Sequence, residues 1–286
     1  MPLLPPSRKR SYDIIYSLGC NCSTAGFLNK HYLRNTSGPF DWWAVTPFPE
    51  EFDWRIRLIC THFEGFMQKE NMEREPLPEG APEDTLFQNY LDHFGPGFHF
   101  PHDFPAGVPF EQAYPKVKAK YERRIARFYQ KIQESERVLL VWQSLCQDSC
   151  EPNRIKRLCE EACRALGKTV DFLLIWQDDS MSRDQAPVKQ ELAPNIILWR
   201  ANIYRKGENN LPLYMGAPEL MDPIFRAYAL RGAEHVAFWN HTRRCIGRPL
   251  GSFLSCFIPV RSWRKRVRSY FKEDRYNKDF NRDLRK

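Results

Sequence analysis

The chain has 286 residues, of which 42% are hydrophobic and 27% charged. These proportions are those of an ordinary globular protein, so the composition excludes a largely disordered chain and allows a sizeable buried core. The formal net charge is +8, but much of the excess lies in the segment 261–286, which argues against a broad nucleic-acid groove and against a specific nucleic-acid partner.

The chain shows no membrane-spanning or export segment. No run approaches the roughly 18 consecutive apolar residues that a spanning helix needs, and the proline-rich, basic residues 1–12 lack the apolar core of a signal peptide. We therefore expect a cytoplasmic protein. Its nine cysteines should be reduced thiols, because their spacing is not that of a disulfide framework.

Short apolar runs alternate with helical stripes along the chain. The patterns predict strands at residues 13–18, 138–142, 169–176 and 195–203, and helices at 22–33, 52–66, 116–135, 154–166 and 218–229. The region 138–176 reads as a right-handed βαβ unit. We expect an α/β fold, a three-layer α/β/α arrangement around a mostly parallel open sheet, with a long irregular insertion between the first helix and the second strand. Residues 1–256 would form one domain and residues 257–286 a basic C-terminal tail.

Cys22 follows the first predicted strand and opens the first predicted helix, with Asn21 as its N-cap. A helix N-terminus favours the thiolate, which is the nucleophilic form of cysteine, and its free N–H groups could hold an oxyanion during acyl transfer. The alternative is that Cys22 is a small residue packed beneath the helix.

A cysteine hydrolase also needs a base, and the FHFPHDF segment at 98–104 offers His102 followed by Asp103. An Asp cannot easily orient the ring of its own neighbour, so Asp41 is a second candidate for the third member. The alternative for His102 is an exposed loop histidine without a role.

The segment from Ser17 to Trp43 resembles the opening motif of an uncharacterised family of proposed papain-like cysteine peptidases. The matching positions are Leu18, Gly19, Cys22, Ala25, Leu33, Arg34, Pro39, Phe40, Asp41 and Trp42, followed later by His102, Asp103 and a basic helix at 121–128. The resemblance implies a Cys22/His102 dyad assisted by Asp103 or Asp41. We expect no cofactor. A papain-like enzyme packs its cysteine helix against an antiparallel sheet, whereas periodicity predicts parallel strands; we follow the periodicity for the fold.

Two groups of side chains have residue types that can bind a metal ion. Cys146, Cys150, Cys159 and Cys163 form two C-x-x-x-C pairs that could enclose zinc, although core packing of a helix explains the second pair. His99 with His102 and Asp103 could also bind a metal ion. We expect no metal.

We expect a cysteine-dependent hydrolase or acyl transferase acting on a peptide or acyl substrate. One alternative is a glycan-processing or sugar-transferase-related protein of surface-polysaccharide assembly, although no glycine-rich phosphate loop supports it. Another is a non-catalytic interaction module that uses Trp42, Trp43 and Trp54. The basic, aromatic tail at 257–286 could contact the anionic inner face of a membrane.

Overall fold

The computed structural model describes residues 10–19, 22–45, 50–76, 86–144, 151–206 and 215–233. Several sequence predictions lie outside the described residues: the Asn21 cap, the zinc candidates Cys146 and Cys150, and the tail at 257–286. In the described part, no helix is long and apolar enough to cross a membrane.

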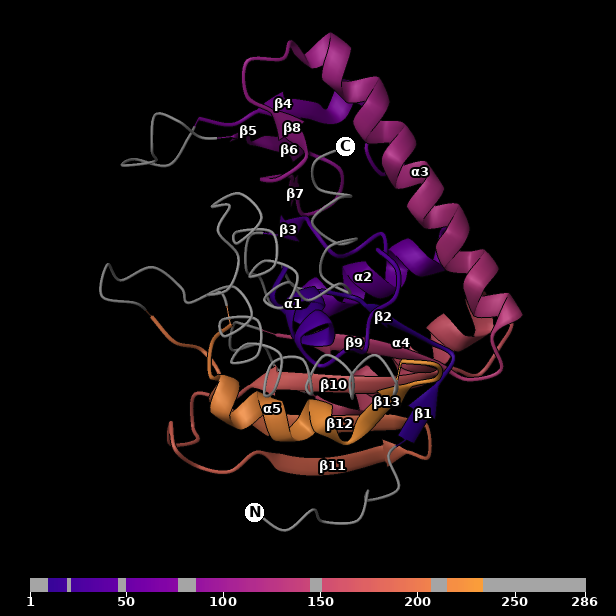
Figure 1. Cartoon of the computed structure of the whole chain (residues 1–286), viewed down its shortest axis with the longest axis vertical. Coiled ribbons are helices and arrows are strands. Elements are labelled where there is room, and N and C mark those ends of the chain that lie inside the picture. The colour runs from indigo at the N-terminus through magenta and orange to yellow at the C-terminus, as the bar shows by residue number, and fades with distance from the viewer. Residues whose placement is uncertain are drawn as a thin grey trace, which may run out of the picture.

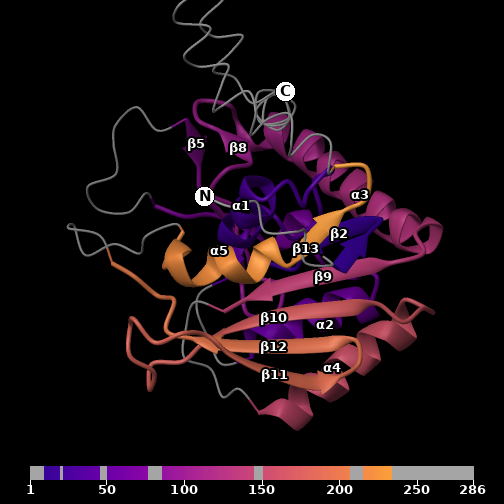
Figure 2. The ribbon, with the colours of Figure 1, turned by 60° about the horizontal axis from the view of Figure 1, so that its bottom comes forward.

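A five-stranded sheet forms the centre of the fold (Figure 2). Its strands run in the order β11 (Val188–Ala193), β12 (Ile196–Ala201), β10 (Asp171–Gln177), β9 (Val138–Gln143) and β2 (Ile14–Ser17). The last four are mutually parallel, whereas β11 is an antiparallel edge strand. The predicted α/β class and the parallel sheet are therefore confirmed. The helix that begins at Cys22 packs against this parallel sheet, at β2 and β9, whereas a papain-like scaffold packs it against an antiparallel one.

Helices cover both faces of this sheet. Because side chains alternate along a strand, Ile14 and Tyr16 of β2 face one apolar cluster and Ile15 faces another. The first cluster includes α2 (Glu51–Cys60), α3 (Phe110–Glu134) and α4 (Pro152–Ala165); the second includes α1 (Cys22–Lys30) and α5 (Pro218–Arg226). The near-continuous apolar runs of β9 and β10 follow from this two-sided burial.

The predicted βαβ unit is present as β9, α4 and β10, with Phe172 of β10 opposite Leu140 of β9. Some of the predicted helix boundaries were wrong, and the helix predicted at 22–33 ends at Lys30. The helix predicted at 52–66 ends at Cys60, and His62, Phe63 and Met67 adopt left-handed backbone angles beyond it. The helix predicted from residue 116 begins at Phe110 and accommodates Pro115 near its start.

The sequence predicted a long irregular insertion between the first helix and the second strand, but the segment between α1 and β9 contains regular elements. It contains a small antiparallel sheet and a two-stranded ribbon that lie above the central sheet in Figure 1. The small sheet has the order β3 (Ala44–Val45), β7 (Phe98–His99), β6 (Tyr90–Asp92) and β4 (Met72–Arg74), the ribbon pairs β5 (Phe87–Gln88) with β8 (Phe104–Pro105), and a 3-10 turn spans Lys69–Asn71. Strands of two or three residues are too short to leave a periodic signal.

A second small pairing ties the two ends of the described chain together. Strand β1 (Arg10–Tyr12) lies parallel to β13 (Tyr228–Leu230). The helix predicted at 218–229 therefore ends earlier, at Arg226, because the chain turns into β13.

Candidate active site

Cys22 is the first residue of α1, and the preceding strand β2 ends at Ser17. The N–H of Leu18 donates to the carbonyl oxygen of Val141 at 2.7 Å, and Gly19 adopts a φ of 68°. The position of Cys22 at the helix start is thus confirmed. The lowered thiol pKa expected at a helix start is not found. Cys22 is half-buried, and burial raises the pKa of its thiol to about 11. The resting protein therefore holds a protonated thiol at neutral pH.

Gln143 lies beside the start of α1, at the carboxyl end of β9. The hydroxyl of Ser23 donates to its Oε1 at 3.1 Å, and the Gln143 side chain is fully buried. Its Nε2 has no hydrogen-bond acceptor among the described residues. A buried amide donor without an acceptor is costly, so this N–H is suited to an oxygen that arrives with a ligand.

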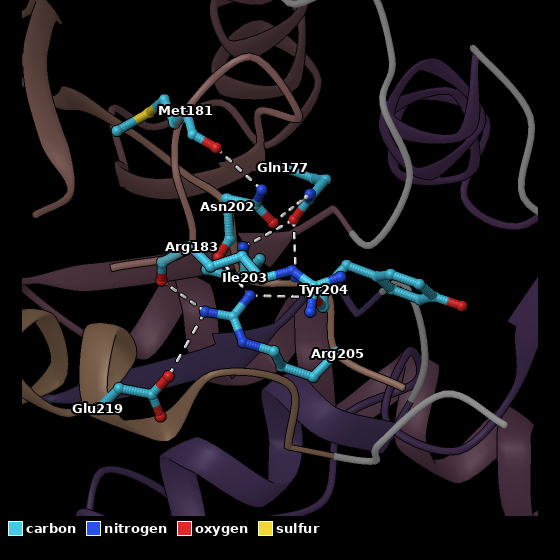
Figure 3. Close-up of polar contacts among 8 residues, drawn as sticks. All are labelled: Gln177, Met181, Arg183, Asn202, Ile203, Tyr204, Arg205 and Glu219. Atoms are coloured by element: carbon cyan, nitrogen blue, oxygen red, sulfur yellow. Dashed lines mark hydrogen bonds and ion pairs between the residues drawn. The ribbon is translucent and has the colours of Figure 1, made fainter. Parts of the chain in front are cut away.

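Gln177 shows the contrasting case at the same edge of the sheet (Figure 3). Its Oε1 accepts from the backbone N–H groups of Ile203 and Tyr204, both at 2.8 Å, and its Nε2 donates to Asn202 Oδ1 at 3.1 Å. Asn202 Nδ2 in turn donates to the carbonyl oxygen of Met181 at 3.0 Å. Gln177 therefore links the ends of β10 and β12, and its polar atoms are occupied within the protein.

His102 lies in the turn between β7 and β8, on the small sheet rather than beside Cys22. Its ring meets those of Trp42 and Phe87 edge to face, with centroids 6.4 and 6.2 Å away. Although His102 reaches the surface, partial burial lowers the pKa of its ring. Within the described structure His102 makes no hydrogen bond to Cys22. Figure 1 places α1 against the central sheet and β7 and β8 above it.

Asp103 points away from its neighbour. It accepts a hydrogen bond from the Tyr121 hydroxyl at 2.6 Å and forms an ion pair with Lys120, so its carboxylate is attached to α3. Its negative charge still raises the pKa of His102, against the larger lowering by burial.

Asp41 is a buried ion-pair partner. Its Oδ2 accepts from Arg34 Nη2 at 2.5 Å and from the N–H of Gly38 at 2.7 Å, and Arg34 also donates to Ser37 Oγ at 2.9 Å. Both charged side chains are at most 5% exposed. The described contacts give Asp41 a role in closing the loop after α1.

The described residues do not support either of the two metal sites that the sequence suggested. Cys159 is buried in the core, and the Cys163 thiol lies 3.8 Å from the carbonyl oxygen of Val170, as helix packing predicts. His99 Nδ1 bonds Glu75 at 2.7 Å. In the described part of the chain, no group of three His, Cys, Asp or Glu side chains could hold a metal ion.

Trp42, Trp43 and Trp54, the tryptophans named for an interaction module, are buried or half-buried in the described structure. Trp43 is fully buried, and Trp42 is only 8% exposed. Trp54 is half-buried, with Phe94 edge-on to its ring and the Arg57 guanidinium 4.5 Å from its ring centroid.

Two functional candidates escaped the sequence reasoning. Gln143 ends an apolar strand and carries no motif that would single it out. Arg124 did carry a signal: it lies three residues after Tyr121 and four before Phe128, on the buried stripe of α3, where a charge is out of place.

These features define an α/β protein whose candidate nucleophile lies at the start of a helix, beside the carboxyl end of a parallel sheet. The chain belongs to the family described as "Putative papain-like cysteine peptidase", whose model matches residues 13–177. It is also 28% identical over 160 residues to the uncharacterized protein R408 of Acanthamoeba polyphaga mimivirus, an alignment that covers 51% of this chain and 67% of the viral protein. No solved structure matches the chain.

Proposed function

We propose that the protein is a cysteine-dependent hydrolase or acyl transferase in which Cys22 attacks the carbonyl carbon of a peptide or acyl substrate. The observation that carries the proposal is a half-buried thiol at the start of α1 whose next residue, Ser23, donates to Gln143 Oε1, while the Gln143 Nε2 has no acceptor among the described residues. The thiol would supply the nucleophile, and the Gln143 Nε2–H would donate to the oxyanion of the tetrahedral intermediate.

The high pKa of the Cys22 thiol requires a base to remove its proton during attack. We assign this role to His102, whose lowered pKa keeps the ring neutral and able to accept a proton at neutral pH. Because His102 does not hydrogen-bond Cys22 in the resting structure, it would have to approach the thiol when substrate binds. Asp103 would assist by its charge, and Asp41 by holding the loop that carries Trp42.

Acyl transfer to the thiol tests the proposal directly. Incubation with p-nitrophenyl acetate followed by intact-protein mass spectrometry should show one acetyl group on the wild type and on Cys60→Ser, which removes another half-buried thiol. Cys22→Ser should form no thioester. Gln143→Leu should slow acylation by about 10²- to 10³-fold, the usual effect of losing one oxyanion donor. Equal acylation of wild type and Cys22→Ser would contradict the assignment.

Two further proposals concern where the protein is located and what its C-terminal segment contacts. We propose a cytoplasmic location, and we propose that the basic segment 257–286 contacts anionic lipid. Flotation with phosphatidylserine vesicles, comparing the full chain with one ending at residue 256, would test the second.

A further inference from the structure

A pocket of about 250 Å³ lies between the loop that carries His102 and the first half of α3. One side is aromatic, formed by Trp42, Phe87 and His102. The other side is basic and opens into an adjoining hollow of about 650 Å³ along α3. Lys116, Lys120 and Arg124 line both spaces, so the two form one continuous site.

Arg124 is the most unusual residue of this site. It is 6% exposed, and its Nη1 is buried without a hydrogen-bond partner. Its guanidinium lies over the face of Tyr121, 5.4 Å from the ring centroid. A buried charge is normally paired, because the cost of removing it from water is otherwise uncompensated. The nearby carboxylates do not serve: Asp103 is bound to Lys120 and Tyr121, and Asp41 is bound to Arg34.

The other cations around Arg124 add to the positive charge. Lys116 and Arg123 form no ion pair with any described residue, and Arg127 donates from Nη2 to the carbonyl oxygen of Ser37 at 3.2 Å but leaves its Nε buried without a partner. Across both spaces, five basic side chains face a single carboxylate, that of Asp103. This excess exceeds the charge of one carboxylate ligand and suits a group with two negative charges.

We propose that this site binds a small molecule that carries a phosphate group on a ring. The phosphate oxygens would accept hydrogen bonds from Arg124, with Lys116 and Arg123 closing over them from the rim. The ring would occupy the aromatic side, against Trp42 and Phe87, where an apolar body gains from leaving water. Cys22 does not line this site, so binding is independent of the proposed nucleophile.

Phenyl phosphate is the matched probe, because it joins one phosphate to one ring, and inorganic phosphate tests the anion alone. Both should raise the melting temperature of the wild type, with phenyl phosphate effective at lower concentration, since a ligand of the folded state stabilises it. Lys131→Gln, which removes a charge of α3 outside the site, and Cys22→Ser should bind like the wild type.

Arg124→Met separates a ligand role from a structural one. It should abolish the response to both probes and, in the absence of ligand, leave the melting temperature unchanged or raise it, because an uncompensated buried charge is removed. The exposed double change Lys116→Gln/Arg123→Gln, which cannot disturb the core, should weaken binding about tenfold or more. No response of the wild type, an undiminished response of Arg124→Met, or binding only to anionic vesicles would overturn the proposal.

Discussion

Replacing Asp41 with Asn distinguishes a structural carboxylate from a catalytic one. The substitution keeps the size of the side chain and an oxygen that can accept from Gly38, but it removes the negative charge that lies 2.5 Å from Arg34. Because Arg34 is itself only 4% exposed in its side chain, its charge cannot be compensated by water.

Breaking a buried ion pair by removing one partner costs about 3–5 kcal/mol of unfolding free energy. For a chain of this size, each kcal/mol corresponds to roughly 2–4 °C, so the melting temperature should fall by about 6–20 °C. Asp53→Asn is the control, because Asp53 pairs with Arg154 where both side chains are about a quarter to a third exposed. That loss should stay within about 1 kcal/mol.

Urea denaturation followed by circular dichroism measures both changes. The double variant Arg34→Met/Asp41→Asn should recover part of the lost stability, since it removes the charge that Asp41→Asn leaves behind. The reasoning is refuted if Asp41→Asn keeps the wild-type midpoint. If that stable variant also lost acylation of Cys22, Asp41 would belong to the catalytic group instead.

Three further outcomes follow from the described contacts. Because burial raises the pKa of Cys22 to about 11, its alkylation by iodoacetamide should accelerate about tenfold per pH unit from about pH 7 to 10, and a plateau below about pH 8 would contradict this. The lowered pKa of His102 means that the unfolded chain takes up a proton near pH 6.5 before the folded protein does. Wild-type stability should therefore fall on acidification from about pH 7.5 to 5.5, and His102→Gln should lose less in urea titrations. Gln177→Leu leaves the N–H groups of Ile203 and Tyr204 without their acceptor, and should cost about 2–5 kcal/mol in the same assay.

The central sheet could be predicted because its strands are buried on both faces. β9 is buried along its whole length, and such a run has few alternative explanations. β11 was missed for the opposite reason: its residues Val188–Glu191 are exposed at the sheet edge, and their polar pattern does not indicate a strand. Its place is fixed by pairing with β12, which is a tertiary property.

The candidate site was only partly predictable, because the chemistry of a group depends on what surrounds it. The order of strand, turn and helix placed Cys22 at a helix start, and this held. The predicted lowering of the Cys22 pKa was wrong, because burial raises the pKa more than the helix start lowers it. The family resemblance implied that Asp103 or Asp41 assists His102, yet His102 and Asp103 point to opposite sides: the His102 ring lies edge-on to Trp42, and the Asp103 carboxylate accepts a hydrogen bond from Tyr121.

The contacts of the motif residues show which of them hold the loop after α1 in place. Arg34 and Asp41 are matched to each other as a buried ion pair, and Trp43 donates from Nε1 to the carbonyl oxygen of Pro39 at 2.7 Å while Arg55 lies over its ring at 3.7 Å. The contacts of these residues therefore explain their presence in the motif by their role in the folded structure. Cys22 differs in its chemistry, because a thiol at a helix start is the nucleophile that the proposed acyl transfer requires. Because the thiol is only half-buried, Cys22→Ala should leave the free energy of unfolding within about 1 kcal/mol of the wild type while removing the acyl-enzyme; a large loss of stability would make this thiol another packing residue.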